Sequence, residues 1–458
     1  MPNEPIFFPP WKIKMVEPIQ ILSRREREEA IKRAGYNTFN LRSDEVMIDL
    51  ISDSGTNAIS TRQYADAILA SESVNTRALK DLHEAVQEVY NKTYCLTFHQ
   101  GRAAERLIFD ALTGRKKYII GNSYFLTTLE FARRLSLEWH DLIVEEAYRL
   151  ESPYPFKGNM DLEKLQATVR EYGSENIAFV RMEANVNIIG GQPFSLENIR
   201  ELRKIADGFG LMLVLDATLL SENAYFIWER EFDFQPDFSP AKIVRMIADL
   251  FDIIYVSSKR DHIAPSGGLL IANDPAVFER LKTVWELYEG IGVSGRDIAM
   301  IAQGIKESMD ERYLASRIRQ VQDFGSHLLN LGLPVCLPLG GHAVHLDAKK
   351  FVPHLKSDQF PAQSLAAAYY VESGVRAMEM GSVALGVDSS AKRDTHPELE
   401  MLRLAIPRRV YTKEHLDYAA SALKRTWEER ASIKGLKMMY DPGVLRSFKA
   451  RFDIKKVW

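Results

Sequence analysis

The sequence predicts an α/β protein with a mostly parallel sheet, followed by a second, smaller α/β domain. Short apolar runs alternate with amphipathic stretches between about residues 90 and 270, which is typical of strands joined by helical crossovers. After about residue 310 the pattern becomes helix, strand pieces and helix again. We therefore expect an N-terminal arm at 1–18, a large domain at 57–313, and a small domain formed by 19–56 with 314–458.

The large domain is expected to hold five buried strands, at 94–98, 117–120, 177–182, 211–215 and 253–256. An amphipathic helix is expected at 161–172, ended by Gly173, and Ser195 is the expected N-cap of the next helix. Ligands of such sheets bind beyond the C-terminal ends of the strands. The residues that follow the strands are therefore the first candidates for a functional site.

Composition excludes several classes of protein. Of the 458 residues, 46% are hydrophobic and 26% charged, and the formal net charge is −3, so we expect neither a nucleic-acid partner nor a membrane surface. Only Cys95 and Cys336 are cysteines, no Cys/His cluster has zinc spacing, and no signal peptide is evident, so we expect a cytoplasmic enzyme without a bound metal. The N-terminal arm is expected to be either disordered or packed against a partner subunit, and its aromatic residues Phe7, Phe8 and Trp11 favour packing.

Two strand ends carry residues suited to a charged ligand. Gln100, Gly101 and Arg102 open a helix, where free backbone N–H groups favour an anion; an ordinary strand–helix turn is the alternative. Asp216 ends a buried strand, and a buried carboxylate costs several kcal/mol unless it is paired. A protonated pyridine nitrogen would be a suitable partner, and a structural salt bridge or helix cap is the alternative.

Two further residues complete a recognisable set. Phe125 could stack on a planar ring, although a lone Phe is usually part of the core. Arg408 follows a strand and a proline and could hold a carboxylate through two hydrogen bonds, although surface arginines are common. Phosphate donors, a stacking ring, a strand-end aspartate, a lysine-containing strand end and a carboxylate-binding arginine are what fold-type I pyridoxal 5'-phosphate (PLP) enzymes assemble.

The chain also resembles one family of these enzymes, the tyrosine phenol-lyase and tryptophanase family of β-eliminating lyases. The resemblance runs from about residue 4 to Asp453. The similar segments occur in the same order as in the family, at 36–39, 53–58, 99–102, 185–187 with 190–193, 216–218, 222–227, 340–344, 360–366 and 406–412.

The resemblance implies a fold-type I architecture, a homotetramer, PLP as cofactor and an amino acid as substrate. By matching position, the phosphate would be held by Gln100, Gly101, Arg102 and Ser257. Phe125 would stack on the ring, Asp216 would pair with its nitrogen, and Thr218 would belong to the same cofactor-binding set. Asn187 would bind the ring's phenolic oxygen or the substrate carboxylate. Arg408 would hold the substrate carboxylate, with Thr56 nearby.

The chain departs from the family pattern where proton transfer takes place. The family's second lysine in Ser-x-Lys-Lys-Asp forms the Schiff base, but here the motif ends Lys259-Arg260-Asp261. A guanidinium stays protonated and is a poor nucleophile, so Arg260 cannot form that bond. The family arginine that lies by the cofactor's oxygen is replaced by Leu219, and the one that helps select a phenol side chain is replaced by Met380. These two residues predict a more apolar pocket at the side-chain end.

Two further family positions fall in one short segment. The tyrosine that protonates the leaving group falls near Ser73. The glutamate used for a monovalent cation falls near Ser71, with Glu72 adjacent, so that cation site is doubtful.

Three hypotheses follow for the function. The first is a PLP-associated amino-acid lyase with altered chemistry, in which Lys259 replaces the missing lysine or PLP is bound non-covalently. The second is a catalytically silent member that binds PLP or an amino acid. The third is an anion pocket that no longer uses PLP, formed by Arg260 and Arg102.

Overall fold

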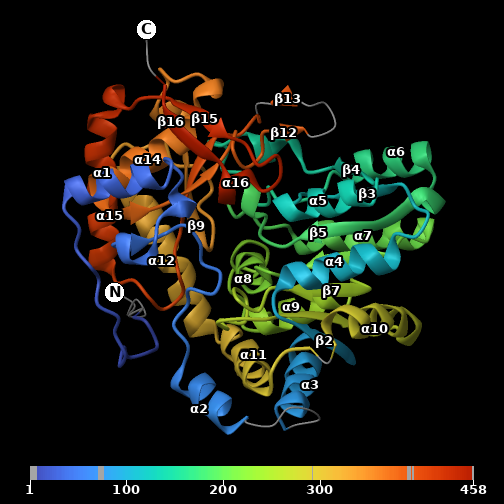
Figure 1. The fold of residues 1–458 in the computed structure, drawn as a ribbon. Helices are drawn as coiled ribbons and strands as arrows, with labels where there is room; N and C mark the ends of the chain where they lie inside the picture. Colours follow the sequence, from blue (N-terminus) through green and yellow to red (C-terminus); the bar gives the residue numbers. More distant parts are fainter. Residues whose placement is uncertain (1–7, 71–76, 291, 389–392, 395–396, 456–458) are drawn as a thin grey trace. The chain divides into compact units, whose positions relative to one another are not determined.

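The computed structural model describes residues 8–70, 77–290, 292–388, 393–394 and 397–455 (Figure 1). The chain divides into two compact units, which are described separately. Unit 1 comprises 1–10, 54–147 and 154–317, and unit 2 comprises 11–53, 148–153 and 318–458.

Unit 1 is built on a seven-stranded sheet with the order β2-β8-β7-β6-β5-β3-β4. Neighbouring strands pair in parallel from β7 to β4, whereas β8 pairs antiparallel with both β2 and β7. The predicted α/β fold with a mostly parallel sheet is therefore confirmed. The strands are β2 (Tyr94–Phe98), β3 (Tyr118–Gly121), β4 (Glu138–Asp141), β5 (Ile177–Glu183), β6 (Leu213–Asp216), β7 (Ile253–Val256) and β8 (Gly268–Ala272).

The five expected strands all form; β2 and β7 have the expected bounds, and the other three are shifted by one or two residues. The edge strand β4 and the antiparallel strand β8 were not expected. β4 carries the polar sequence Glu-Trp-His-Asp, which lacks an apolar run, and β8 is as apolar as its neighbours.

Two helices of unit 1 begin or end at the residues that the sequence predicted. Ser195 caps α7 by accepting a hydrogen bond from the Asn198 N–H, and α6 ends at Gly173, whose φ of 79° suits glycine. The helices are α2 (Thr61–Leu69), α3 (Arg77–Tyr90), α4 (Gly101–Leu112), α5 (Leu126–Arg134), α6 (Leu162–Tyr172), α7 (Leu196–Phe209), α8 (Leu220–Arg230), α9 (Pro240–Ala248), α10 (Pro275–Glu289) and α11 (Gly295–Ser308).

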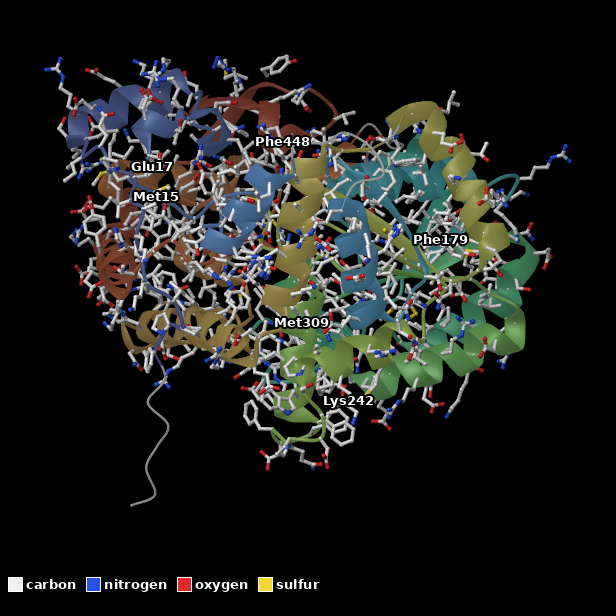
Figure 2. The ribbon with its side chains drawn as sticks, turned by 90° about the horizontal axis from the view of Figure 1, so that it is seen from below. Met15, Glu17, Phe179, Lys242, Met309 and Phe448 are labelled. Carbon is white, nitrogen blue, oxygen red and sulfur yellow. The ribbon has the colours of Figure 1, made fainter. Side chains whose placement is uncertain are left out.

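The core of unit 1 consists of apolar side chains on both faces of the sheet. Phe179 of β5, labelled in Figure 2, is 1% exposed and packs edge-on against Phe109 of α4. On the other face, Val180 and Met182 belong to a cluster that also includes Leu202 of α7. Burial of both faces fixes the sheet, and with it the positions of the residues that follow the strands.

Unit 2 contains a three-stranded antiparallel sheet, ordered β11-β14-β9, and helices packed around its core. Its helices are α1 (Arg24–Arg33), α12 (Glu311–Asn330, which starts in unit 1), α13 (Ala348–Phe351), α14 (Pro361–Ser373), α15 (Lys413–Glu428) and α16 (Arg446–Lys449). Its strands are β1 (Ile48–Asp49), β9 (Ala343–Asp347), β10 (Val375–Arg376), β11 (Met378–Met380), β12 (Val387–Asp388), β13 (Arg393–Asp394), β14 (Met401–Ala405), β15 (Leu436–Tyr440) and β16 (Arg451–Ile454).

Residues 8–23, which precede α1, form neither helix nor strand. Their apolar side chains Met15, Val16 and Ile21 are 80–85% exposed, and Met15 is labelled in Figure 2. Within the described residues, no helix combines the length and the apolarity required to cross a bilayer.

Candidate functional site

The start of α4 lies directly against the residue that follows β7. A Cβ atom added to Gly101 would lie 2.8 Å from Ser257 Cα, so only glycine allows the two backbones to approach this closely. Among the described residues, the Gln100 side chain makes no capping hydrogen bond to the helix. The N-terminus of this twelve-residue helix therefore faces the 257–261 turn without a side-chain cap.

Three basic side chains gather at this place, and we call Arg102, Lys259 and Arg260 the basic cluster. Burial lowers the pKa of Lys259, and the charges of Arg260 and Arg102 lower it further. Burial also lowers the pKa of Arg102; Glu105 opposes that shift and Arg260 adds to it. Within the described part of the chain, neither Arg102 nor Lys259 forms an ion pair, so their charges are available to an anion.

Residues 257–261 form a turn and do not continue the strand. The Arg260 N–H donates to the Ser257 carbonyl at 3.1 Å, so the side-chain alternation of a strand does not apply to Lys259 and Arg260. The Lys259 carbonyl accepts hydrogen bonds from the Gly55 N–H at 3.0 Å and from Asn57 Nδ2 at 2.8 Å. The exposed Thr56 lies between these two donors in the sequence.

A buried hydrogen-bond chain supports this turn from within the core. Ser258 Oγ lies 3.0 Å from His262 Nδ1, and His262 Nε2 lies 2.7 Å from the Tyr90 hydroxyl. Burial lowers the pKa of His262 to about 3, so the ring is neutral and can link the two hydroxyl groups.

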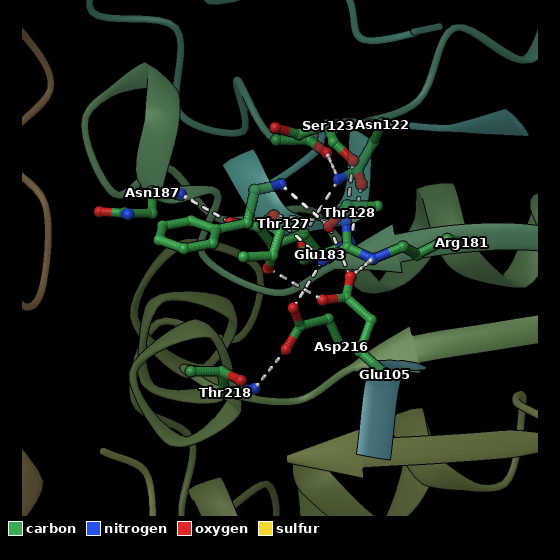
Figure 3. Close-up of polar contacts among 12 residues, drawn as sticks. Glu105, Asn122, Ser123, Thr127, Thr128, Arg181, Glu183, Asn187, Asp216 and Thr218 are labelled. Carbon is green, nitrogen blue, oxygen red and sulfur yellow. Dashed lines mark hydrogen bonds and ion pairs between the residues drawn. The ribbon is translucent and has the colours of Figure 1, made fainter. Parts of the chain in front are cut away.

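Asp216, at the end of β6, belongs to a second group of charges, which Figure 3 shows in close-up. The sheet register places Glu183 of β5 and Tyr255 of β7 on either side of Asp216. Arg181 Nη2 lies 2.6 Å from Asp216 Oδ2, and Arg181 Nη1 lies 3.3 Å from Glu183 Oε2. We call Arg181, Glu183, Asp216 and Glu105 of α4 the acidic cluster.

Tyr255 connects the members of the acidic cluster. Arg181 Nε donates to its hydroxyl oxygen at 2.8 Å, and this hydroxyl lies 3.0 Å from Asp216 Oδ2 and 3.1 Å from Glu105 Oε1. Arg181 is only 1% exposed at its side chain. Burial raises the pKa values of Glu105 and Glu183, and the Arg181 charge opposes both shifts.

Thr218 links the two clusters. Its backbone N–H donates to Asp216 Oδ1 at 3.0 Å, and its Oγ1 accepts a hydrogen bond from the Ser257 N–H at 3.2 Å.

Leu219 precedes α8 and is 2% exposed. Two predicted ring-binding residues also start helical turns: Phe125 is the half-buried N-cap of α5, and the buried Asn187 opens a 3₁₀ turn.

Two predicted substrate residues belong to unit 2. Arg408 is 1% exposed, and its Nη1 lies 2.8 Å from Asp53 Oδ2, so its charge is paired within this unit. Met380, in β11, is 3% exposed. Their predicted substrate roles stay predictions, as do those of the other site residues. The positions near Ser71 and Ser73 lie outside the described residues.

The structure therefore brings Gln100, Gly101, Arg102, Ser257, Lys259 and Arg260 together at one place, and Asp216 with Thr218 beside it. Sequence reasoning missed Arg181, Glu183, Glu105 and Tyr255. A signal was present: Arg181 stands inside the apolar run of β5, and a charge in a buried strand needs a partner just as Asp216 does.

Comparison with known proteins shows the family to which the chain belongs. A family described as "Beta-eliminating lyase" matches residues 49–422. The chain is 45% identical over 449 residues to a tyrosine phenol-lyase of Symbiobacterium thermophilum, covering 97% of this chain and 98% of that protein. It is 42% identical over 451 residues to a tyrosine phenol-lyase of Nostoc punctiforme, covering 97% and 96%.

Solved structures show the same fold at low sequence identity. A serine palmitoyltransferase of Sphingomonas wittichii superposes with a TM-score of 0.62 at 14% identity, covering 89% of this chain and 97% of that chain. The architecture is that of fold-type I PLP-dependent enzymes, as the sequence predicted.

Proposed function

The chain belongs to the β-eliminating lyase family, and from this premise we propose that it is a PLP-associated, lyase-like enzyme of amino acids with altered chemistry. The alteration would come from Arg260, which we place at the position of the family's cofactor-binding lysine. The observation that carries the proposal is the basic cluster, because a set of cations beside a helix N-terminus suits the phosphate of PLP.

Other features of unit 1 also suit PLP. The close approach of Gly101 to Ser257 brings Ser257 beside the helix N-terminus, where both could contact a phosphate. The acidic cluster contains three carboxyl groups, on Glu105, Glu183 and Asp216, and one guanidinium, so it suits a further cation such as a protonated ring nitrogen. Ser123 Oγ is buried beside this cluster and has no hydrogen-bond partner among the described residues.

When bound, PLP supplies an electron sink for carbanion chemistry. Arg102, Ser257 and the start of α4 would hold its phosphate, with Lys259 and Arg260 adding charge. Asp216 would face the ring nitrogen, and Phe125 and Asn187 would contact the ring. Arg260 would bind and orient a negatively charged group but would not take up a proton, because a guanidinium stays protonated.

The first experiment tests cofactor binding and its chemical form. The protein is mixed with PLP and desalted, its absorption spectrum is recorded, and it is reduced with borohydride before peptide mapping by mass spectrometry. We expect PLP to be retained. A label on Lys259 would mean covalent attachment at that residue, and a retained spectrum without a label would mean non-covalent binding. Loss of PLP on desalting would contradict the proposal and favour the anion pocket without PLP.

Two variants sharpen this experiment. Arg260→Lys restores the residue that the family uses, so its reduced label should lie at position 260. Lys259→Met should abolish any label found on Lys259. Release of phenol from L-tyrosine by the unmodified protein, at a rate equal to that of Arg260→Lys, would contradict altered chemistry.

Substrate turnover separates an enzyme from a silent binder. We propose an apolar amino-acid side chain, since the predicted side-chain positions are Leu219 and Met380. Amino acids are added to the PLP-loaded protein, and product is followed by chromatography. Binding of PLP with no turnover of any amino acid would favour the silent family member. We also propose a homotetramer, in which a partner covers the exposed Met15, Val16 and Ile21; light scattering would measure its mass.

A further inference from the structure

The hydrogen-bonding capacity of Asp216 is largely used within the protein. Its Oδ2 atom contacts Arg181 Nη2 at 2.6 Å and the Tyr255 hydroxyl at 3.0 Å. Its Oδ1 atom accepts the Thr218 N–H at 3.0 Å. Each carboxylate oxygen offers about two lone pairs, so Oδ2 is fully occupied and Oδ1 keeps one acceptor position.

The groups that face Asp216 come from two strands and one helix. Arg181 and Glu183 lie on β5, Tyr255 on β7 and Glu105 on α4. Arg181 is the only cation that contacts an acid of this set within the described residues. It divides its guanidinium between Asp216 and Glu183, while its Nη1 also donates to the Ser123 carbonyl at 2.9 Å.

We propose that Arg181 competes with the ring nitrogen of bound PLP for Asp216 and thereby makes that nitrogen more acidic. Arg181 is in this sense a positioning residue: it acts on the cofactor through the aspartate. The inference rests on the proposed function, because it assigns Asp216 to the ring nitrogen.

The physical reason is a competition between two cations for one anion. A protonated ring nitrogen gains from the negative charge of Asp216. A guanidinium on the opposite oxygen takes part of that charge and repels a second cation nearby, and the low effective dielectric of the buried cluster strengthens both effects. A less protonated ring withdraws electrons less strongly, so Arg181 would weaken the electron sink in a protein that also lacks the family lysine.

The test measures the ring nitrogen directly. The probe is 4'-deoxypyridoxine 5'-phosphate labelled with ¹⁵N in the ring; it has no aldehyde and cannot react with Lys259. The ¹⁵N chemical shift of the bound probe is followed against pH, because protonated and neutral pyridine nitrogens resonate far apart. In Arg181→Met, we expect the nitrogen to lose its proton at a pH higher by about one unit or more than in the unmodified protein.

Two controls keep the test decisive if Arg181→Met folds poorly. The double variant Arg181→Met with Glu183→Gln removes the arginine together with one of its carboxyl partners, so fewer acids lose their counter-ion, and it should still raise this pH. Arg181→Lys keeps a cation and should stay closer to the unmodified protein. A merely structural role would alter affinity in these variants without a graded change in the nitrogen's titration.

The outcomes separate this inference from the proposed function. Binding of the probe with the same titration in all variants, or a lower pH in Arg181→Met, would overturn the role of Arg181 and leave PLP binding intact. Failure of the unmodified protein to retain either the probe or PLP would overturn both.

Discussion

The basic cluster and the acidic cluster lie at the same end of the sheet in unit 1, and they handle charge in opposite ways. The positive charges of the basic cluster, on Arg102, Lys259 and Arg260, repel one another. The acidic cluster is almost fully buried and contains its own counter-ion, Arg181. Thr218 bonds to both, through Asp216 and Ser257.

The two clusters therefore require different groups from a ligand. The partly exposed basic cluster favours an anion from outside. The acidic cluster, with three carboxyl groups and one guanidinium, favours a further cation or protons. A ligand with a phosphate at one end and a basic ring nitrogen at the other meets both requirements. The predictions below test whether the two clusters differ in this way.

The largest expected effect is on folding stability, from Arg181→Met. This change leaves the carboxyl groups of Glu105, Glu183 and Asp216 buried without their arginine, which costs about 3–5 kcal/mol in the free energy of unfolding. Denaturant unfolding measures it. The control is Arg25→Met, whose side chain is 88% exposed and pairs with Glu29; it should cost less than about 1 kcal/mol. Equal losses in both variants would mean that the acidic cluster does not depend on its arginine.

The second effect is on ligand affinity, from Arg102→Met. Losing a charged hydrogen-bond donor should weaken binding of 4'-deoxypyridoxine 5'-phosphate about tenfold to a hundredfold. Calorimetry or fluorescence titration measures the Kd. Arg106, one turn further along α4, lies 3.5 Å from Glu289 and serves as the control. An equal loss of affinity in Arg106→Met would argue against a specific anion site at the basic cluster.

Much of the fold could be predicted because its signals are local. The apolar runs of β2, β5 and β7 and the stop at Gly173 are short-range patterns, and the structure confirms them. Two strands were missed, although the apolar run of β8 was itself a local signal. The edge strand β4 has an ordinary polar sequence, and the antiparallel direction of β8 depends on pairing with strands distant in the sequence.

The site could be predicted only where the position of the backbone determines which residues meet. Gly101 and Ser257 meet because both follow strands of one sheet. The partners of Asp216 were not predictable, because Arg181 reaches it across neighbouring strands and Tyr255 through a side-chain hydroxyl. Likewise, no local pattern indicates that Asp53 pairs with Arg408 within unit 2. A charged residue in a buried strand indicates that it has a partner, but it does not indicate which residue that partner is.

Unit 2 contains a pair of buried acids, Glu379 and Glu400, whose carboxyl groups accept hydrogen bonds mainly from backbone N–H groups. Glu379 accepts from the N–H groups of Val383 and Ala384, and Glu400 accepts from that of Ser382. Burial and then the nearby Glu400 raise the pKa of Glu379 to about 8. The folded state therefore binds more protons than the unfolded state between about pH 4.5 and pH 8, and stability should fall as pH rises through that window.

Glu379→Gln should reduce this dependence, while Glu400, whose pKa burial also raises, keeps its own contribution. The slope that one group contributes is at most about 1.4 kcal/mol per pH unit, and thermal or denaturant unfolding at several pH values measures it. Glu29→Gln, at a side chain that is 65% exposed, is the control and should leave the profile unchanged. A profile that keeps its slope in Glu379→Gln would assign the pH dependence to other groups.

The smallest effect is on the reactivity of a single amine. Burial, Arg260 and Arg102 lower the pKa of Lys259, whereas the hydrogen bond to Asp161 raises that of Lys164. Because only the neutral amine reacts, Lys259 should reach half-maximal labelling by an amine reagent at a lower pH than Lys164. Quantitative peptide mapping measures both residues in one sample. Inorganic phosphate should raise the midpoint of Lys259 alone, since a bound anion offsets the charges of Arg102 and Arg260. Equal midpoints, or no response to phosphate, would mean that the cations of the basic cluster act independently.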